Sequence, residues 1–145
     1  MEDRNYIINR IMSKRTTANE FEYDKLTAPP ISSMFTMDDI NQLRKIATSV
    51  RYAGNPDKKY KLIDEIMKRR GFAKFVSGTN RVSYRCLEDD SFIIKIAFDD
   101  VGIKDNPKEF KNQFLLKPFC TKVFEVTPCG TLGVFERVNP ITSRE

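Results

Sequence analysis

Hydrophobic residues recur with two different periods along this chain. Between residues 34 and 71, apolar side chains return every three or four positions, which is typical of amphipathic helices. From residue 72 onward, short runs rich in aromatic and β-branched residues are separated by turn-forming residues, which is typical of strands. The pattern therefore predicts an α+β domain in which a helical hairpin, residues 34–71, precedes a sheet, residues 72–145.

The hairpin has sequence signals at its helix ends. Thr36 precedes acidic residues and is the predicted N-cap of the first helix. Asn55-Pro56 predicts the start of the second helix, with proline at its first position, and Gly71 is expected just past its end. The expected apolar stripes are Ile40, Leu43, Ile46, Ala47 and Val50, then Tyr60, Ile63, Ile66 and Met67.

Residues 1–33 are predicted to form an N-terminal helix followed by an extended arm. Residues 5–14 have one apolar face, but a helix of about three turns is unstable alone. It must pack against its own domain, a partner or a second copy. Beyond it the periodicity disappears and Pro29-Pro30 stiffens the chain. The apolar residues of the short helix are Ile7, Ile8, Ile11 and Met12.

The second half of the chain predicts a five-stranded antiparallel sheet with one packed helix. Its strands are short and are separated by glycine, proline and acidic turns. The expected elements are two strands around a turn at 77–80, a turn at 88–90, a strand at 92–98, a helix at 106–116 and strands at 122–126 and 131–138.

Lys95 interrupts an otherwise apolar strand, so we expect it to be shielded from water on both sides. A buried ammonium needs an anionic partner, which can be a carboxylate or a phosphate. In the turn at 77–80, Gly78 and Asn80 tolerate positive φ, and backbone N–H groups in such a turn can hold phosphate oxygens. The alternatives are an edge lysine whose stem reaches solvent and an ordinary hairpin glycine.

Residues 78–85, the hairpin after them and Ile94-Lys95-Ile96 together resemble the first three strands of the small N-terminal lobe of protein-kinase-like folds. The turn places Gly-x-Asn before a valine and a tyrosine, and so is similar to the aminoglycoside phosphotransferase and choline kinase branch. The resemblance covers about half of the chain, and one glycine stands where protein kinases show three.

This resemblance implies an ATP site. It places Gly78, Thr79 and Asn80 over the nucleotide phosphates, Val82 against the base, and Lys95 on the α- and β-phosphates. ATP is therefore the expected cofactor, and the domain would be of the pseudokinase type.

The same resemblance assigns roles to three residues further along the chain. Glu109 falls on the helix that supplies the ion-pair partner of the lysine, and Glu136 and Val138 fall on the hinge whose backbone meets the adenine. Glu109 has an alternative explanation, because it stands three residues after Asn106 and would complete a capping box there.

Groups for phosphotransfer and for metal binding are missing from the pattern. The chain has no histidine and no Asp-Phe-Gly, and nothing up to Glu145 matches a catalytic loop or its magnesium ligands. The three cysteines form no C-x-x-C pair, so no metal is predicted. We therefore expect a small lobe that acts by binding, or one lobe of a longer kinase-like protein.

A net charge of +5 raises the question of partners. The hairpin basic residues predict either a nucleic-acid surface or an ordinary solvated face balanced by acids. The helix pair ahead of the lobe also resembles uncharacterised bacteriophage proteins, so an alternative is an interaction module that inhibits or redirects a host protein. The residues in question are Arg51, Lys58, Lys59, Lys61, Lys68, Arg69 and Arg70.

Other expectations concern location and self-association. No apolar stretch is long enough to span a membrane, and the start of the chain does not resemble a secretory signal, so a cytoplasmic protein is expected. An exposed apolar patch is predicted around Val134, Val138 and Ile141. A protein partner, a second copy bound through the N-terminal helix and this edge, or the N-terminal extension of the chain itself would cover it.

Overall fold

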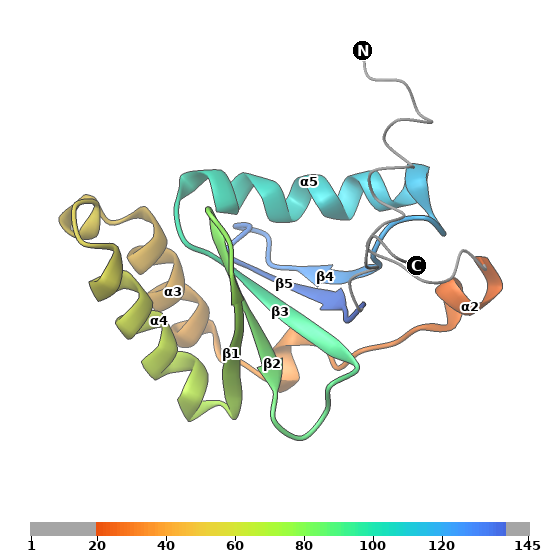
Figure 1. Ribbon diagram of the computed structural model, residues 1–145, viewed down its shortest axis with the longest axis horizontal. Helices are drawn as coiled ribbons and strands as arrows, with labels where there is room; N and C mark the ends of the chain where they lie inside the picture. The colour runs from red at the N-terminus through yellow and green to blue at the C-terminus, as the bar shows by residue number, and fades with distance from the viewer. Residues whose placement is uncertain (1–19, 139–145) are drawn as a thin grey trace, which may run out of the picture.

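The structure is a computed structural model that describes residues 20–138, so the predicted helix at 5–14 and Ile141 lie outside the described residues. It confirms an α+β fold with a five-stranded antiparallel sheet (Figure 1). The described elements are α2 (Glu20–Lys25), η1 (Ile31–Ser33), α3 (Met37–Thr48), η2 (Val50–Tyr52), α4 (Pro56–Arg69), β1 (Phe72–Ser77), β2 (Arg81–Cys86), β3 (Phe92–Ala97), α5 (Asp100–Leu116), β4 (Val123–Val126) and β5 (Leu132–Glu136).

The strands lie in the order β1-β2-β3-β5-β4, which places β3 at the centre of the sheet. Lys95 of β3 lies opposite Ser83 of β2 and Gly133 of β5. Because side chains alternate between faces, Ile94 and Ile96 point to one side of the sheet and Lys95 to the other. The α3–α4 hairpin covers the first face and α5 covers part of the second (Figure 1).

The hairpin face contains the main hydrophobic core. The apolar stripes of α3 and α4 pack on strand residues that alternate with the polar ones. The fully buried side chains of this core include Leu43, Ile63 and Met67 from the helices and Val82, Ile94, Ile96, Leu132 and Val134 from the strands. The hairpin and the sheet therefore share one core.

The helix-end predictions for the hairpin are confirmed. Thr36 and Asp39 form a reciprocal capping box, Asn55 accepts a hydrogen bond from the backbone N–H of Lys58, and Gly71 has a φ of 85°. The assignment of Val50 to the apolar stripe of the first helix is wrong, because Val50 lies beyond the end of α3 and is 88% exposed.

The predicted apolar patch is corrected at Val134. This side chain is fully buried, because it lies on the sheet face that the hairpin covers. At Val134 the cover is the helical hairpin of the chain itself, and not a partner, a second copy or the N-terminal extension.

Helix α5 begins six residues earlier than predicted. Asp99 is its N-cap and accepts a hydrogen bond from the backbone N–H of Gly102 at 3.0 Å. Pro107 lies inside the helix, where it cannot donate a hydrogen bond to the carbonyl of Ile103. Gly130 packs against that carbonyl, since a Cβ on Gly130 would lie 2.1 Å from the oxygen. Asn106 is therefore an interior residue, and the capping-box explanation of Glu109 is wrong.

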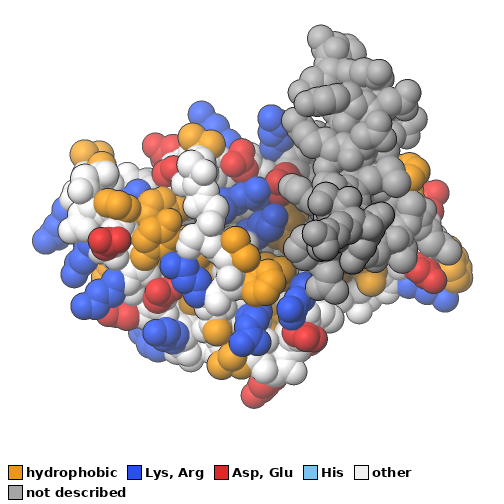
Figure 2. Space-filling model, viewed as in Figure 1, with side chains coloured by type: hydrophobic (Ala, Val, Ile, Leu, Met, Phe, Trp, Pro, Cys, Tyr) orange, Lys and Arg blue, Asp and Glu red, His pale blue; other side chains and the backbone are white. Residues whose placement is uncertain are grey.

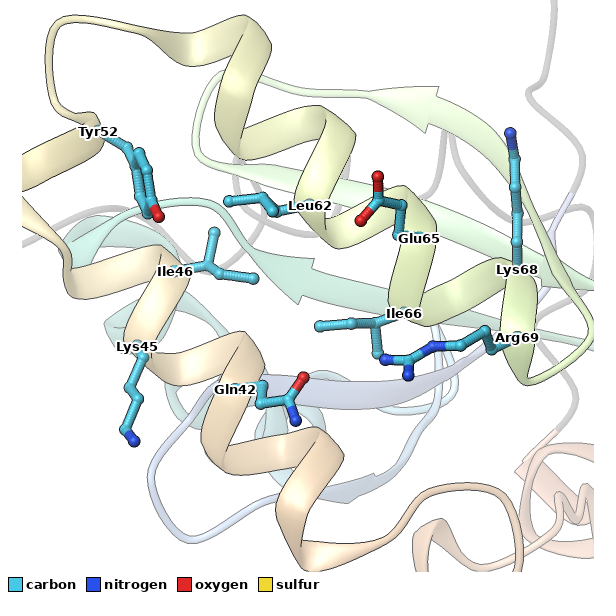
Figure 3. A pocket seen from close by; sticks show the side chains of 9 residues that line it. All are labelled: Gln42, Lys45, Ile46, Tyr52, Leu62, Glu65, Ile66, Lys68 and Arg69. Carbon is cyan, nitrogen blue, oxygen red and sulfur yellow. The ribbon is translucent and has the colours of Figure 1, made fainter.

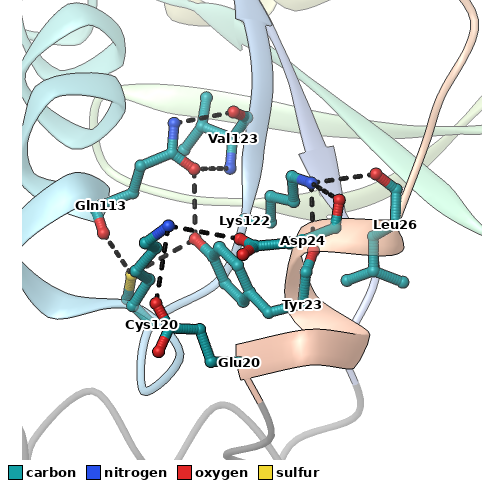
Figure 4. A network of polar contacts seen from close by, with 9 residues as sticks. Glu20, Tyr23, Asp24, Leu26, Gln113, Cys120, Lys122 and Val123 are labelled. Carbon is teal, nitrogen blue, oxygen red and sulfur yellow. Dashed lines mark hydrogen bonds and ion pairs between the residues drawn. The ribbon is translucent and has the colours of Figure 1, made fainter.

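The described part of the arm is docked rather than extended throughout. Tyr23 of α2 is 2% exposed and donates a hydrogen bond to Gln113 of α5, while Lys122 donates to the backbone carbonyls of Tyr23, Asp24 and Leu26 (Figure 4). Gln113 in turn binds both backbone groups of Val123. These contacts attach α2 to the corner between α5 and β4.

Candidate functional site

Five side chains meet on the α5 face of the sheet, and we call them the Lys95 cluster: Arg81, Lys95, Asn106, Glu109 and Phe135. They come from β2, β3, β5 and α5. The strand register brings Lys95 and Phe135 together on one face. Lys95 lies opposite Gly133, and Ile93, two residues before Lys95, lies opposite Phe135. Helix α5 then adds Asn106 and Glu109, one helical turn apart.

Arg81 and Glu109 form a bidentate ion pair. Both terminal nitrogens of Arg81 donate to the carboxylate of Glu109 at 2.8 Å, and Nη1 also donates to Oδ1 of Asn106 at 3.0 Å. The side chains are 18% and 38% exposed. Burial opposes the charge on Arg81, but the bonds and charge of Glu109, with a smaller contribution from Asp105, outweigh it and raise the pKa of Arg81. Both carboxylate oxygens of Glu109 are thus engaged by a residue that the sequence analysis did not select.

Asn106 joins the helix to the sheet. It is fully buried, and its Nδ2 donates to the carbonyl of Gly130 at 2.9 Å and to that of Lys95 at 3.4 Å. With Oδ1 bound to Arg81, this amide contacts β2, β3 and the turn before β5. A buried side-chain amide needs hydrogen-bond partners, because each buried donor or acceptor left without one lowers the stability of the fold by about 1–3 kcal/mol.

The aromatic ring of Phe135 lies beside both cations. Nζ of Lys95 lies 4.5 Å from the ring centroid and Cζ of Arg81 lies 5.8 Å from it. These distances are typical of cation–π contacts. Gly133 makes room for the ring, since a Cβ at that position would lie 2.6 Å from Cε1 of Phe135. Lys95 itself is half-buried.

The turn with Gly78, Thr79 and Asn80 lies at the start of α5, but its backbone differs from the prediction. Neither Gly78 nor Asn80 has a positive φ. The N–H of Gly78 donates to the carbonyl of Arg81 at 2.8 Å, and the carbonyl of Asn80 accepts from Phe98 at 2.8 Å. The N–H of Gly78 is therefore used within the hairpin rather than offered to a phosphate, while Thr79 is exposed.

The expectation that Val82 contacts a nucleotide base needs correction. Val82 is fully buried and lies opposite Ile96, on the face covered by the hairpin. Because Lys95 points to the other face, Val82 and Lys95 cannot line the same surface. From sequence alone the strand residues were not assigned to the two faces of the sheet, and Val82 and Lys95 were therefore placed in one site.

Glu136 and Val138 are both half-buried at the end of β5. The N–H of Glu136 donates to the carbonyl of Lys122 at 2.8 Å, and its side chain accepts from the N–H of Lys122 at 3.0 Å. This backbone N–H is thus engaged with the residue that precedes β4. A hinge role for these residues stays a prediction.

A concave feature lies on the hairpin. A groove of about 690 Å³ runs between α3 and α4, with Ile46, Leu62 and Ile66 directed into it (Figure 3). It is lined by Gln42, Lys45, Ile46, Tyr52, Leu62, Glu65, Ile66, Lys68 and Arg69. Over the hairpin, basic and acidic side chains are interspersed with hydrophobic ones (Figure 2).

Two of the basic hairpin residues serve internal contacts. Lys59 is 6% exposed and donates to the carbonyls of Ala47 and Phe98. Arg70 forms an ion pair with Asp39 at 2.7 Å. The basic surface predicted for nucleic acid is reduced accordingly.

The described residues contain no group of three or more metal-ligating side chains, and none of their helices is long and apolar enough to cross a membrane. Cys86 and Cys129 are free thiols. Burial alone would raise the pKa of Cys129, but hydrogen bonds with Thr131 and Thr127 lower it overall.

Comparisons with protein-family models, with curated proteins and with solved structures return no match to this chain. The kinase-like resemblance therefore stays an interpretation of the residues themselves.

Proposed function

We propose that this chain is a kinase-like small-lobe domain that acts by binding, and that the Lys95 cluster holds the phosphates of a nucleotide. The observation that carries the proposal is the meeting of Lys95, Arg81 and Glu109 on one sheet face. In protein kinases the phosphate-binding lysine also lies on the third strand and a glutamate lies on the next helix.

The cluster has the chemistry for this task. Arg81 is held in a fixed orientation by Glu109 and Asn106, which lowers the entropy lost when a ligand binds. Lys95 adds a second positive charge, and a flexible ammonium suits phosphate as a point charge. The ring of Phe135 shields one side of both cations from water.

The nucleotide base would contact β1 rather than Val82. Val76 of β1 lies opposite Ser83, which lies opposite Lys95, so all three point to the same face. Val76 is 53% exposed and lies two strand spacings, about 10 Å, from Lys95. An exposed apolar side chain at that distance suits a base whose phosphates reach the cluster.

Thermal unfolding with ATP and magnesium tests the proposal. We expect the melting temperature to rise by a few degrees and to saturate at millimolar ATP, because a ligand that binds only the folded state stabilises it. Lys95→Met should abolish the rise. Lys111→Met, which removes an exposed lysine from α5, should leave it unchanged. Absence of any shift at millimolar ATP would remove the nucleotide from the proposal.

Inorganic triphosphate separates the two parts of the site. A shift with triphosphate that matches the shift with ATP would show that only the phosphates are recognised. A shift with ATP alone would support the contact with β1, and Val76→Ser should then reduce it.

The interaction-module alternative is favoured by a different observation, the groove between α3 and α4. A module of that kind would bind a protein through the hairpin, whether or not the Lys95 cluster holds a nucleotide. The nucleic-acid alternative receives less support, because Lys59 and Arg70 are engaged within the fold.

A further inference from the structure

The hairpin groove has an apolar base between the two helices, where Leu62 is half-buried and Ile46 and Ile66 are 8% and 4% exposed. Ile46, Leu62 and Ile66 point into it from the two helices (Figure 3). Its volume of about 690 Å³ lies within the range of about 300–1,000 Å³ that is typical of ligand pockets. The groove lies on the hairpin, whereas the Lys95 cluster lies on the opposite face of the sheet.

The rim of the groove carries an excess of positive charge. Lys45 of α3 and Lys68 and Arg69 of α4 are exposed, and none of them forms an ion pair with another described residue. Glu65 is the acidic residue in the lining. The adjacent Arg70 differs, because it is paired with Asp39. These three residues lie in the last turns of α3 and α4, where a positive charge also stabilises the helix dipole. In Figure 3 Arg69 extends toward the groove, and Lys45 and Lys68 extend away from it.

We propose that this groove docks an acidic amphipathic helix of a partner protein. Two apolar side chains spaced i and i+4 on that helix would contact Leu62 and the exposed edges of Ile46 and Ile66. Its flanking carboxylates would contact Lys45, Lys68 and Arg69. Both walls of the groove are helices with their backbone groups already paired, so recognition proceeds through side chains rather than by strand addition.

Two other occupants suit the groove less well. A second copy of this chain, bound through the same groove by two-fold symmetry, would bring its own Lys45, Lys68 and Arg69 against these cations. A nucleic acid would place phosphates next to Glu65 and would leave the apolar base without an apolar partner.

A displayed library of helix-forming peptides, with randomised outer positions, tests the proposal on the full chain. We expect the selected peptides to carry apolar residues at i and i+4 and an excess of Asp and Glu. The triple variant Lys45→Glu, Lys68→Glu and Arg69→Glu should bind a selected, fluorescently labelled peptide about tenfold or more weakly. Each substitution replaces an attraction to the acidic peptide with a repulsion.

The matched control changes the net charge equally outside the groove. Lys58→Glu, Lys61→Glu and Lys111→Glu replace exposed lysines that do not line it, and they should change the affinity by less than about twofold. Leu62→Ser, with a circular dichroism spectrum and melting temperature to verify folding, should also weaken the peptide. An equal loss in both triple variants, or selected peptides without acidic excess, would overturn the proposal, as would a library that yields no binder.

The result is independent of the nucleotide. The groove variants leave the Lys95 cluster intact, so their response to ATP should equal that of the unmodified chain. Failure of peptide binding therefore leaves the nucleotide proposal standing, and failure of the ATP shift leaves the groove proposal standing.

Discussion

The two faces of the sheet are stabilised in different ways. On the hairpin face, fully buried apolar residues such as Ile94 and Leu132 pack on α3 and α4. On the α5 face, the contacts are directional and polar, as in the ion pair of Arg81 with Glu109 and the hydrogen bond of Asn106 with Gly130. Apolar packing tolerates many sequences, whereas a buried polar network requires each partner. The hairpin face therefore provides stability, and the α5 face provides a defined arrangement of charges.

The largest expected effect is on the hairpin face. Ile94→Ala should lower the free energy of unfolding by about 2–5 kcal/mol, because it leaves a cavity at a fully buried position. Urea unfolding with an unchanged slope measures the loss. Val101→Ala, at a side chain that is 53% exposed, is the control and should cost less than about 0.5 kcal/mol. Similar losses in both variants would contradict the assignment of the core to this face.

A smaller effect is expected on the α5 face. Asn106→Ala should lower the free energy of unfolding by about 1–3 kcal/mol, because the carbonyl of Gly130 and one N–H of Arg81 lose their partner. It should also weaken any ATP-induced rise in melting temperature, an effect that Ile94→Ala should not have once its lower stability is accounted for. If both variants reduced the ATP response in proportion to stability alone, the contrast between the faces would fail.

The smallest expected effect is an acid-dependent loss at the start of α3. Burial alone raises the pKa of Asp39, but the bonds from Arg70 and Thr36 lower it overall. A lowered pKa in the folded state means that the stabilisation is present at neutral pH. It is lost as the pH falls below about 4.

Asp39→Asn provides the comparison for that loss. The variant should be less stable by about 1–2 kcal/mol at pH 7 and should lose less stability on acidification than the unmodified chain. Urea unfolding at neutral and acid pH measures both. Parallel pH profiles for the two proteins would show that Asp39 does not contribute.

The hairpin could be predicted because its signals are local. Thr36 with Asp39, and Asn55 with Pro56, each fix a helix end through contacts within four residues. The start of α5 was missed because Gly102 and Pro107 are usually found outside helices. Gly102 has a tertiary reason, since a Cβ there would lie 2.2 Å from the carbonyl oxygen of Asn80.

The candidate site was only partly predictable. Lys95 stood out because it interrupts an apolar strand, and Glu109 because of the kinase-like resemblance. Arg81 gave no local signal, since its partner Glu109 is 28 residues away and the pair depends on how α5 crosses the sheet. Val82 was assigned to the wrong surface for a related reason. Alternation fixes which residues share a face, but the helix that covers each face is decided by tertiary packing.

Lys122 has a consequence for the beginning of the described chain. A helix of six residues is too short to persist by its own hydrogen bonds, and the ammonium of Lys122 binds the carbonyls at and beyond its end. The helical structure of α2 therefore depends on a side chain that lies 99 positions after Tyr23 in the sequence. Acetylation of that amine would remove the charge, and α2 would lose the support that keeps it folded.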